Sequence, residues 1–188
     1  LNVVAKGAAL ERTAQVALEQ TLKKLPIAKM MHYQVQQKNG ELVEVEFARP
    51  VHRIVALHGK NILNISALGI DASNQTEGHR FLTPGIITIT SADQYESDLS
   101  NKAKVIPSFN LRNEYIQSAL LKAAGDDVVL MPDSLLDEVT ALVEWPAIYE
   151  CHFDPEFLEV PQECLILTMQ TNQKYFALTD KQGKLRNR

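Results

Sequence analysis

Residues 108–125 read SFNLRNEYIQSALLKAAG, and this stretch carries the clearest helix signal in the chain. Ser108 or Asn110 can cap its start, and Gly125 can close it, as glycine often does after a last helical turn. Its apolar side chains recur at helical spacing: Leu111, Tyr115, Ile116, Ala119, Leu120 and Ala123. We therefore expect a helix that packs on a core through this stripe.

Downstream of this stretch the sequence mixes short strands with further helices. Residues 128–130 favour a short buried strand, and Asp133 can cap a helix that continues to about residue 143. Residues 147–153 favour a strand, and Pro161 suits the first position of a helix through about residue 171. A terminal hairpin is expected to begin at residues 175–179.

Upstream of it the sequence is richer in strands. A helix is predicted over residues 8–25, a polar loop over 71–79 and a short helix over 92–102; strands are predicted over 41–47, 51–58, 61–68 and 85–90. Because strands and helices do not alternate strictly, we predict an α+β (mixed α/β) fold with helices packed on a mixed sheet. The 188 residues then form one α+β region, or two lobes: a strand-rich one over about 1–90 and a helix-rich one over 91–188.

The composition is that of an ordinary globular domain, with 45% hydrophobic and 22% charged residues. No run approaches the roughly 18 to 20 apolar residues of a membrane span. With only two cysteines, Cys151 and Cys164, a disulfide framework is not expected, and a reducing cytoplasmic setting fits. The net charge of −4 excludes a simple, strongly basic nucleic-acid binder.

That net charge is unevenly distributed. Residues 1–60 carry a balance of +4, residues 61–125 of −1, residues 126–173 of −11 and residues 174–188 of +4. A polyanion would be repelled by the third segment, so nucleic acid is expected to approach only the first or the last. The alternative is that the acidic stretch is a solvated face that keeps the domain soluble.

No local signature of nucleotide or metal chemistry is present. The glycines never group as a phosphate-binding loop, and neither CxxC nor HExxH occurs. We therefore expect no metal site and no cofactor site in this chain. Cys164, among apolar neighbours on a predicted helix, is expected to be a buried thiol rather than a nucleophile.

Three polar clusters are candidates for binding. Two of them, around residues 47–53 and 76–81, can place Arg49, His52, His79 and Arg80 in one basic pocket for a carboxylate or phosphate. Alternatively, these residues hold loops through hydrogen bonds to backbone carbonyls. In the third cluster, Lys174 and Tyr175 can contact a nucleic-acid backbone and stack on a base, or simply begin a strand.

Read together, the motifs occur in an order that resembles the β subunit of the bacterial tetrameric glycyl-tRNA synthetase family. They are Arg49-Pro50-Val51-His52, Gly78-His79-Arg80-Phe81, 135–139 with 142–146, 157–161 with Glu163, and Met169 with 173–176. The chain departs from the family at Arg53, where an aromatic residue is usual, and at Asn172, where histidine is common. Because the family's subunit is far longer, and this chain starts at Leu1 without Met, we expect an internal segment of the N-terminal half.

The resemblance implies a fold similar to the B3/B4 editing-type module of phenylalanyl-tRNA synthetase. It implies a cytoplasmic, heterotetrameric class II ligase in which the α subunit activates glycine with ATP and Mg²⁺. This segment would then have no catalytic site of its own. It would support recognition of tRNA(Gly) and contact with the α subunit and the remaining β-subunit domains, without a membrane.

Two other functions remain open at this point. A hydrolytic editing domain would need a positioned water, a base and an oxyanion donor, which His52, His79 and Arg80 can supply. A pocket for glycine, however, excludes every larger amino acid sterically, so the need for editing is weak. The third alternative is a pure scaffold that holds other domains in place.

Overall fold

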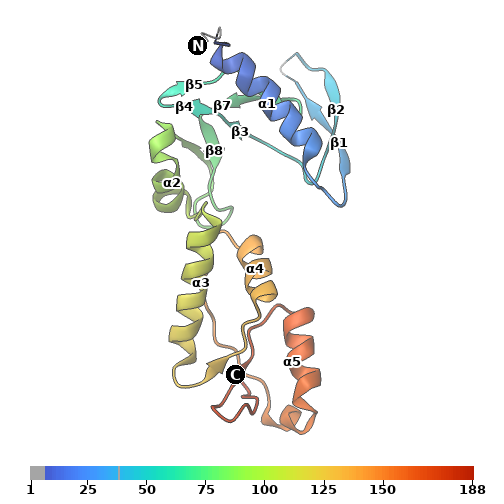
Figure 1. Cartoon of the computed structure of the whole chain (residues 1–188), viewed down its shortest axis with the longest axis vertical. Coiled ribbons are helices and arrows are strands. Elements are labelled where there is room, and N and C mark those ends of the chain that lie inside the picture. The colour runs from blue at the N-terminus through green and yellow to red at the C-terminus, as the bar shows by residue number, and fades with distance from the viewer. Residues whose placement is uncertain (1–6, 38) are drawn as a thin grey trace, which may run out of the picture. The chain divides into compact units, whose positions relative to one another are not determined.

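The computed structural model describes residues 7–37 and 39–188, which form two compact units. Unit 1 extends to Asp98, and unit 2 is Leu99–Arg188. Both combine helices with small sheets, so the predicted α+β class is confirmed (Figure 1). None of the helices in the described part of the chain is both long and apolar enough to cross a membrane.

Unit 1 contains one long helix and several short strands. Helix α1 spans Leu10–Lys24. The longest hairpin joins β1 (Met31–Gln36) to β2 (Leu42–Phe47), with Met31 opposite Phe47. The remaining strands are β3 (Ile54–Val55), β4 (Leu57–His58), β5 (Asn61–Ile62), β6 (Ser66–Ala67), β7 (Ile70–Ser73), β8 (Gln75–Glu77) and β9 (Ile86–Thr88). Unit 1 ends with a 3-10 turn over Ala92–Gln94 and the short helix α2 (Tyr95–Asp98).

The strands of unit 1 pair in small sheets. Strand β7 is central to a three-stranded sheet, parallel to β3 and antiparallel to β6. Two hairpins, β4–β5 and β8–β9, complete the unit. The prediction of a polar loop over residues 71–79 is wrong, because β7 and β8 occupy most of it. Their side chains are largely polar, so the local sequence gives no strand signal, although β6 and β9 pair with them from nearby in the chain.

Helix α1 is held to unit 1 by polar contacts more than by burial. None of its residues is buried, although Leu18 and Leu22 are half-buried. The Glu11 carboxylate accepts the Asn64 amide at 2.9 Å. The Gln15 side-chain amide exchanges two hydrogen bonds of 2.9 Å with the Ser66 backbone. These bonds fix one side of α1 against the strands and leave the other side in solvent.

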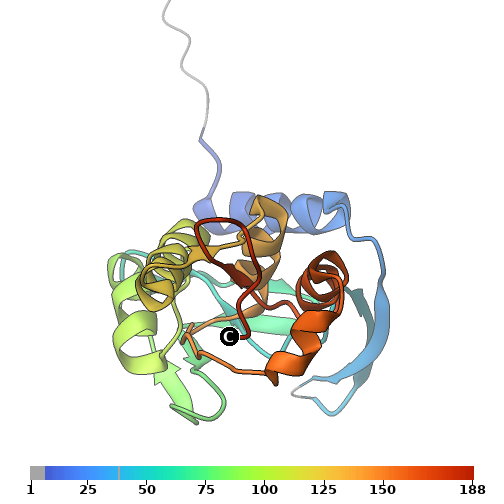
Figure 2. The ribbon, with the colours of Figure 1, turned by 90° about the horizontal axis from the view of Figure 1, so that it is seen from below.

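Unit 2 is built on α3 (Phe109–Ala124) and α4 (Asp133–Leu142). A π-helical turn over Leu99–Ala103 precedes them. Strand β10 (Val128–Val129) pairs antiparallel with β11 (Leu178–Thr179), and the 3-10 turn η3 (Pro155–Glu159) leads into α5 (Gln162–Thr171). The C-terminal segment lies between α3 and α5 in both views (Figure 1, Figure 2).

The predicted boundaries of α3 are confirmed. The Ser108 hydroxyl accepts the Leu111 amide at 3.4 Å, and Gly125 ends α3 with a φ of +63°. The predicted stripe supplies Ile116 and Leu120 to a core with Leu136, against which further apolar side chains pack: Val129, Met131, Val139, Val143, Ile148 and Phe176. The terminal hairpin is also confirmed, since Thr179 bridges to Leu185.

The predicted cap of α4 is wrong: Asp133 is the first helical residue, and Pro132 at the N-cap makes no side-chain hydrogen bond. Part of the predicted α3 stripe is also exposed, at Leu111, Tyr115 and Ala123.

Two other expectations for unit 2 are wrong. Residues 147–153, all of which the structure describes, form an extended segment without strand pairing. Cys164 is exposed, because α5 has no buried residue and turns this position to solvent. Both errors have the same cause: an apolar sequence was read as a buried element, whereas here the apolar side chains line an open surface.

The Ile116 side chain should account for a large share of the stability of unit 2, because it is 1% exposed at the centre of the core. We expect Ile116→Ala to lower the free energy of unfolding by about 3 kcal/mol through lost burial and a cavity. Leu121→Ala on the same helix, where the leucine is 56% exposed, is the matched control and should change little. Urea unfolding of the two variants measures the difference; equal losses would contradict this account of the core.

Candidate functional site

Unit 1 contains a groove of about 880 Å³ between the first hairpin and the three-stranded sheet. Its lining comes from β1, from residues 50–53 and from β6 and β7, and includes the side chains of Tyr33, His52 and Arg53. The Val51 amide donates to the Tyr33 hydroxyl at 3.3 Å, which fixes the 50–53 segment beside β1. Most of the polar groups that line this groove are amides and hydroxyls.

The floor of this groove requires glycine at position 69. Gly69 has a φ of +74°, a conformation that side chains disfavour. A Cβ at this position would lie 3.3 Å from the Cβ of Val35, closer than ordinary van der Waals contact. The β6–β7 turn can therefore pass under β1 only because residue 69 has no side chain.

The two sequence motifs of unit 1 are joined by a residue outside the predicted set. Arg53 Nε donates to Glu77 Oε1 at 3.0 Å, linking the 47–53 motif to β8. Of the four predicted pocket residues, His52 lines the groove, whereas Arg49 contacts the Met31 sulfur at 3.4 Å. The ion pair to Glu77 was missed because its partner lies 24 positions away in sequence.

His79 has a local structural contact. Its Nδ1 atom accepts the backbone amides of Phe81 and Leu82 at 3.3 and 3.2 Å. Its bonds are therefore to backbone N–H groups rather than to the carbonyls that the alternative reading named. Arg80 is exposed beside it. A single basic pocket shared by Arg49, His52, His79 and Arg80 stays a prediction.

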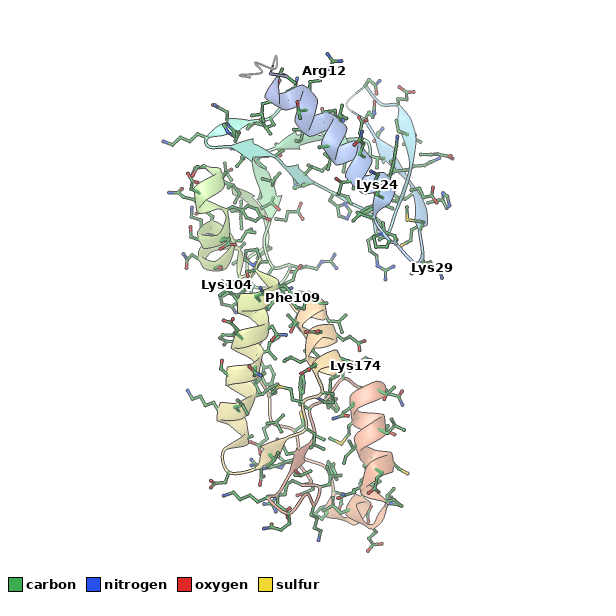
Figure 3. All side chains as sticks on the ribbon, viewed as in Figure 1. Arg12, Lys24, Lys29, Lys104, Phe109 and Lys174 are labelled. Carbon is green, nitrogen blue, oxygen red and sulfur yellow. The ribbon has the colours of Figure 1, made fainter. Side chains whose placement is uncertain are left out.

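A row of exposed cations follows α1 and the turn after it. Arg12, Lys23, Lys24 and Lys29 are all exposed and make no ion pair with the described residues. Figure 3 shows Arg12 towards the start of α1, Lys24 at its end and Lys29 before β1. Lys6 and Lys38 lie outside the described residues. These cations of the basic 1–60 segment are available to an external anion, as are the exposed Arg49 and Lys60.

Unit 2 contains a second groove, of about 770 Å³, which we call the apolar groove. It is lined from α3, β10, α4, residues 147–153, η3, α5 and residues 174–178. Its side chains are mainly apolar and aromatic, among them Tyr149, Phe157 and Met169. Both predicted residues of the third cluster, Lys174 and Tyr175, line it as well.

Lys174 forms an ion pair within unit 2. Its Nζ donates to Glu138 Oε2 at 2.9 Å, and its backbone adopts a φ of +59°, uncommon for a residue other than glycine. The Tyr175 amide donates to the Met169 carbonyl at 2.9 Å, while its ring is 52% exposed. The Lys174 cation is therefore already paired with the acidic segment.

Arg186 and Arg188 also form ion pairs with the acidic segment, residues 126–173. Arg188 contacts Asp127 and Glu150, each at 2.8 Å, and donates to the Ala124 carbonyl at 2.9 Å. Arg186 Nε lies 3.3 Å from Asp127. The Arg188 hydrogen bonds lower the pKa of both carboxyl groups, against a smaller opposing effect of burial. The same bonds raise the pKa of Arg188 above its ordinary value.

The lowered pKa values of Asp127 and Glu150 predict a loss of stability in acid. Because both carboxylates are stabilised in the folded state, their contribution is complete above about pH 4.5, where they also ionise when unfolded. It is lost as the pH falls through their folded pKa values. We expect Arg188→Gln to flatten the pH dependence of urea unfolding below about pH 4.5.

Lys181→Gln is the matched control for that measurement, because Lys181 is exposed and makes no ion pair with described residues. It should leave the pH profile unchanged. An Arg188→Gln profile parallel to that of the unmodified chain would show that the cluster does not govern acid stability.

No three histidine, cysteine, aspartate or glutamate side chains gather into a possible metal site within residues 7–37 and 39–188. Cys151 and Cys164 are both free thiols. The described grooves thus offer binding surfaces of two kinds, a polar one in unit 1 and an apolar one in unit 2.

The whole chain, residues 1–188, matches the family model described as "Glycyl-tRNA synthetase beta subunit". The chain belongs to this family. A Ralstonia nicotianae protein named "Glycine--tRNA ligase beta subunit" is 56% identical over 184 residues, covering 98% of this chain and 26% of the relative. Proteins of the same name from Neisseria meningitidis and Polaromonas naphthalenivorans are 49% and 46% identical, over 98% and 100% of this chain.

The chain spans about a quarter of the length of these curated relatives, 26 to 27%. The family resemblance predicted from the ordered motifs is thereby confirmed. The motifs that carried it lie in both units: Arg49 and His79 belong to unit 1, and Lys174 to unit 2.

Proposed function

We propose that this chain supports tRNA recognition and domain assembly in a glycine–tRNA ligase, as a non-catalytic segment of the β subunit. Its partners are tRNA(Gly), the α subunit and the remaining β-subunit domains. ATP and Mg²⁺ act on glycine in the α subunit. The observation that supports tRNA contact is the row of exposed cations in unit 1 that make no ion pair with described residues: Arg12, Lys23, Lys24 and Lys29.

The charge environment favours unit 1 as the surface that meets tRNA. Phosphate contacts dominate affinity for nucleic acid, and each neutralised phosphate releases counterions. In residues 174–188, three of the five cations already pair with carboxylates of the acidic segment. Lys181 and Lys184 are exposed in the terminal turn and can add to the contact.

Charge reversal at α1 tests this proposal. We expect Lys23→Glu combined with Lys24→Glu to weaken binding of tRNA(Gly) and to reduce the slope of log affinity against log salt by about one unit for each lysine. Fluorescence anisotropy at several salt concentrations measures both effects. Lys122→Glu, at an exposed lysine on α3, is the matched control and should have little effect.

Neutralising Asp133, Asp137 and Glu138 should leave affinity unchanged or raise it slightly. The Glu138→Gln change should contribute most, because it releases the Lys174 ammonium. A pure scaffold predicts no binding even at low salt. Crosslinks from tRNA onto residues 126–173 would refute the assignment of the contact surface.

We also expect that this chain alone activates no amino acid. The proposal places ATP chemistry in the α subunit, and the sequence lacks any recognised phosphate-binding loop. Glycine-dependent exchange of pyrophosphate into ATP measures activation directly. Exchange above background by the purified chain would overturn the non-catalytic assignment.

A further inference from the structure

Three aromatic side chains that line the apolar groove of unit 2 are largely exposed to water. Tyr149 is 83% exposed, Phe157 is 51% exposed, and both line the groove together with Tyr175. Exposed apolar surface of this kind, gathered around one concavity, marks a site of association. Covering these rings would bury large side chains with few rotatable bonds, which is the usual source of binding energy at interfaces.

The chain segment that supplies much of the groove's lining is acidic. Residues 147–165, which supply much of its lining, contain five carboxylates and no lysine or arginine. Glu150 is held by Arg188, but Glu156, Glu159 and Glu163 are exposed and make no ion pair with described residues. Phe157 and Leu165 of the lining therefore belong to a segment that also carries exposed carboxylates without a cation among the described residues.

The polar groups at this groove do not suit a small ligand. Lys174 forms an ion pair with Glu138, and Arg188 forms ion pairs with Asp127 and Glu150. Small-molecule sites need a few convergent polar groups to orient their ligand. Nucleic acid is disfavoured by the exposed carboxylates of residues 154–163. A protein segment with apolar side chains flanked by lysine or arginine matches both the lining and the charge.

We propose that the apolar groove docks such a basic, apolar segment from the part of the β subunit that lies outside this chain. The inference rests on the assembly role proposed above and names its surface. The curated relatives are nearly four times as long as this chain, so a large body of the same polypeptide needs an anchoring contact. Joined in one chain, even a weak contact is populated, because the effective concentration reaches roughly millimolar values.

The chain supplies its own pair of probes for this contact. Cys151 lines the groove, whereas Cys164 is exposed on α5 outside the lining. In the full-length β subunit we expect a bulky maleimide to label Cys151 at least about tenfold more slowly than Cys164, since a docked segment that hides hot-spot side chains stabilises by more than 1 kcal/mol. Each rate is read by mass spectrometry and divided by the rate for the same thiol in the urea-unfolded subunit.

Two variants test the apolar and the charged components separately. Phe157→Ala should raise Cys151 labelling towards the Cys164 rate, and Tyr115→Ala, at an exposed tyrosine on α3 outside the lining, should not. Glu156→Lys with Glu159→Lys should raise it several-fold, and Glu114→Lys on α3 should not. Equal labelling of the two thiols in the unmodified subunit, or slow Cys151 labelling that persists in Phe157→Ala, would overturn the proposal.

A photo-crosslinking amino acid in place of Tyr149, in the assembled enzyme, identifies the occupant. We expect crosslinks to a basic segment of the same β chain. Crosslinks to the α subunit, a second β copy or tRNA overturn the choice of occupant. Measuring tRNA affinity on the same preparations separates the two proposals: normal, lysine-dependent tRNA binding with fully reactive Cys151 refutes only the docking inference.

Discussion

Unit 2 depends on the contacts of one cation, the guanidinium of Arg188. It joins three segments that do not belong to one helix or sheet. These are the end of α3, through the Ala124 carbonyl, the turn at Asp127 and the segment at Glu150. Asp127 is only 11% exposed, so its charge needs a close partner. Without this arginine, two carboxylates would face each other beside the apolar groove. Residues 147–153 have no strand partner, and Arg188 is one of the few contacts that fix their path.

The Arg188 contacts show that the acidic and basic stretches of the sequence are not separate surfaces. Residues 126–173 contain no lysine or arginine, and residues 174–188 are basic, so the two stretches look like separate surfaces for different partners. In the folded unit, Lys174, Arg186 and Arg188 lie against the acidic segment instead. Part of the negative charge of residues 126–173 is thus neutralised within unit 2 by cations of residues 174–188. The α1 cations Arg12, Lys23 and Lys24, by contrast, make no ion pair with the described residues, and this difference is the basis for proposing unit 1 as the phosphate-binding surface.

The parts of the fold that could be predicted are those encoded by neighbouring residues. Ser108 and Gly125 bound α3 because a cap and a left-handed residue act within one turn. Strands β7 and β8 were missed because β7 takes its parallel partner from β3, a pairing that leaves no local pattern in polar residues. The same limit applies to the sites. Lys174 was identified as a candidate, but its pairing with Glu138, 36 positions away, was not foreseeable from either residue's surroundings.

The Arg188 contacts also determine when unit 2 can become complete during synthesis. Helices α3 and α4 are close in sequence, since α3 ends at Ala124 and α4 begins at Asp133. Their contacts can therefore form early, as local contacts generally do. Asp127 must wait for a partner 61 residues further along the chain. Until residues 186–188 have left the ribosome, Asp127 and Glu150 lack the arginines that pair with them. A nascent chain therefore passes through an interval in which α3 and α4 can already pair while the Arg188 contacts with Asp127 and Glu150 are still absent.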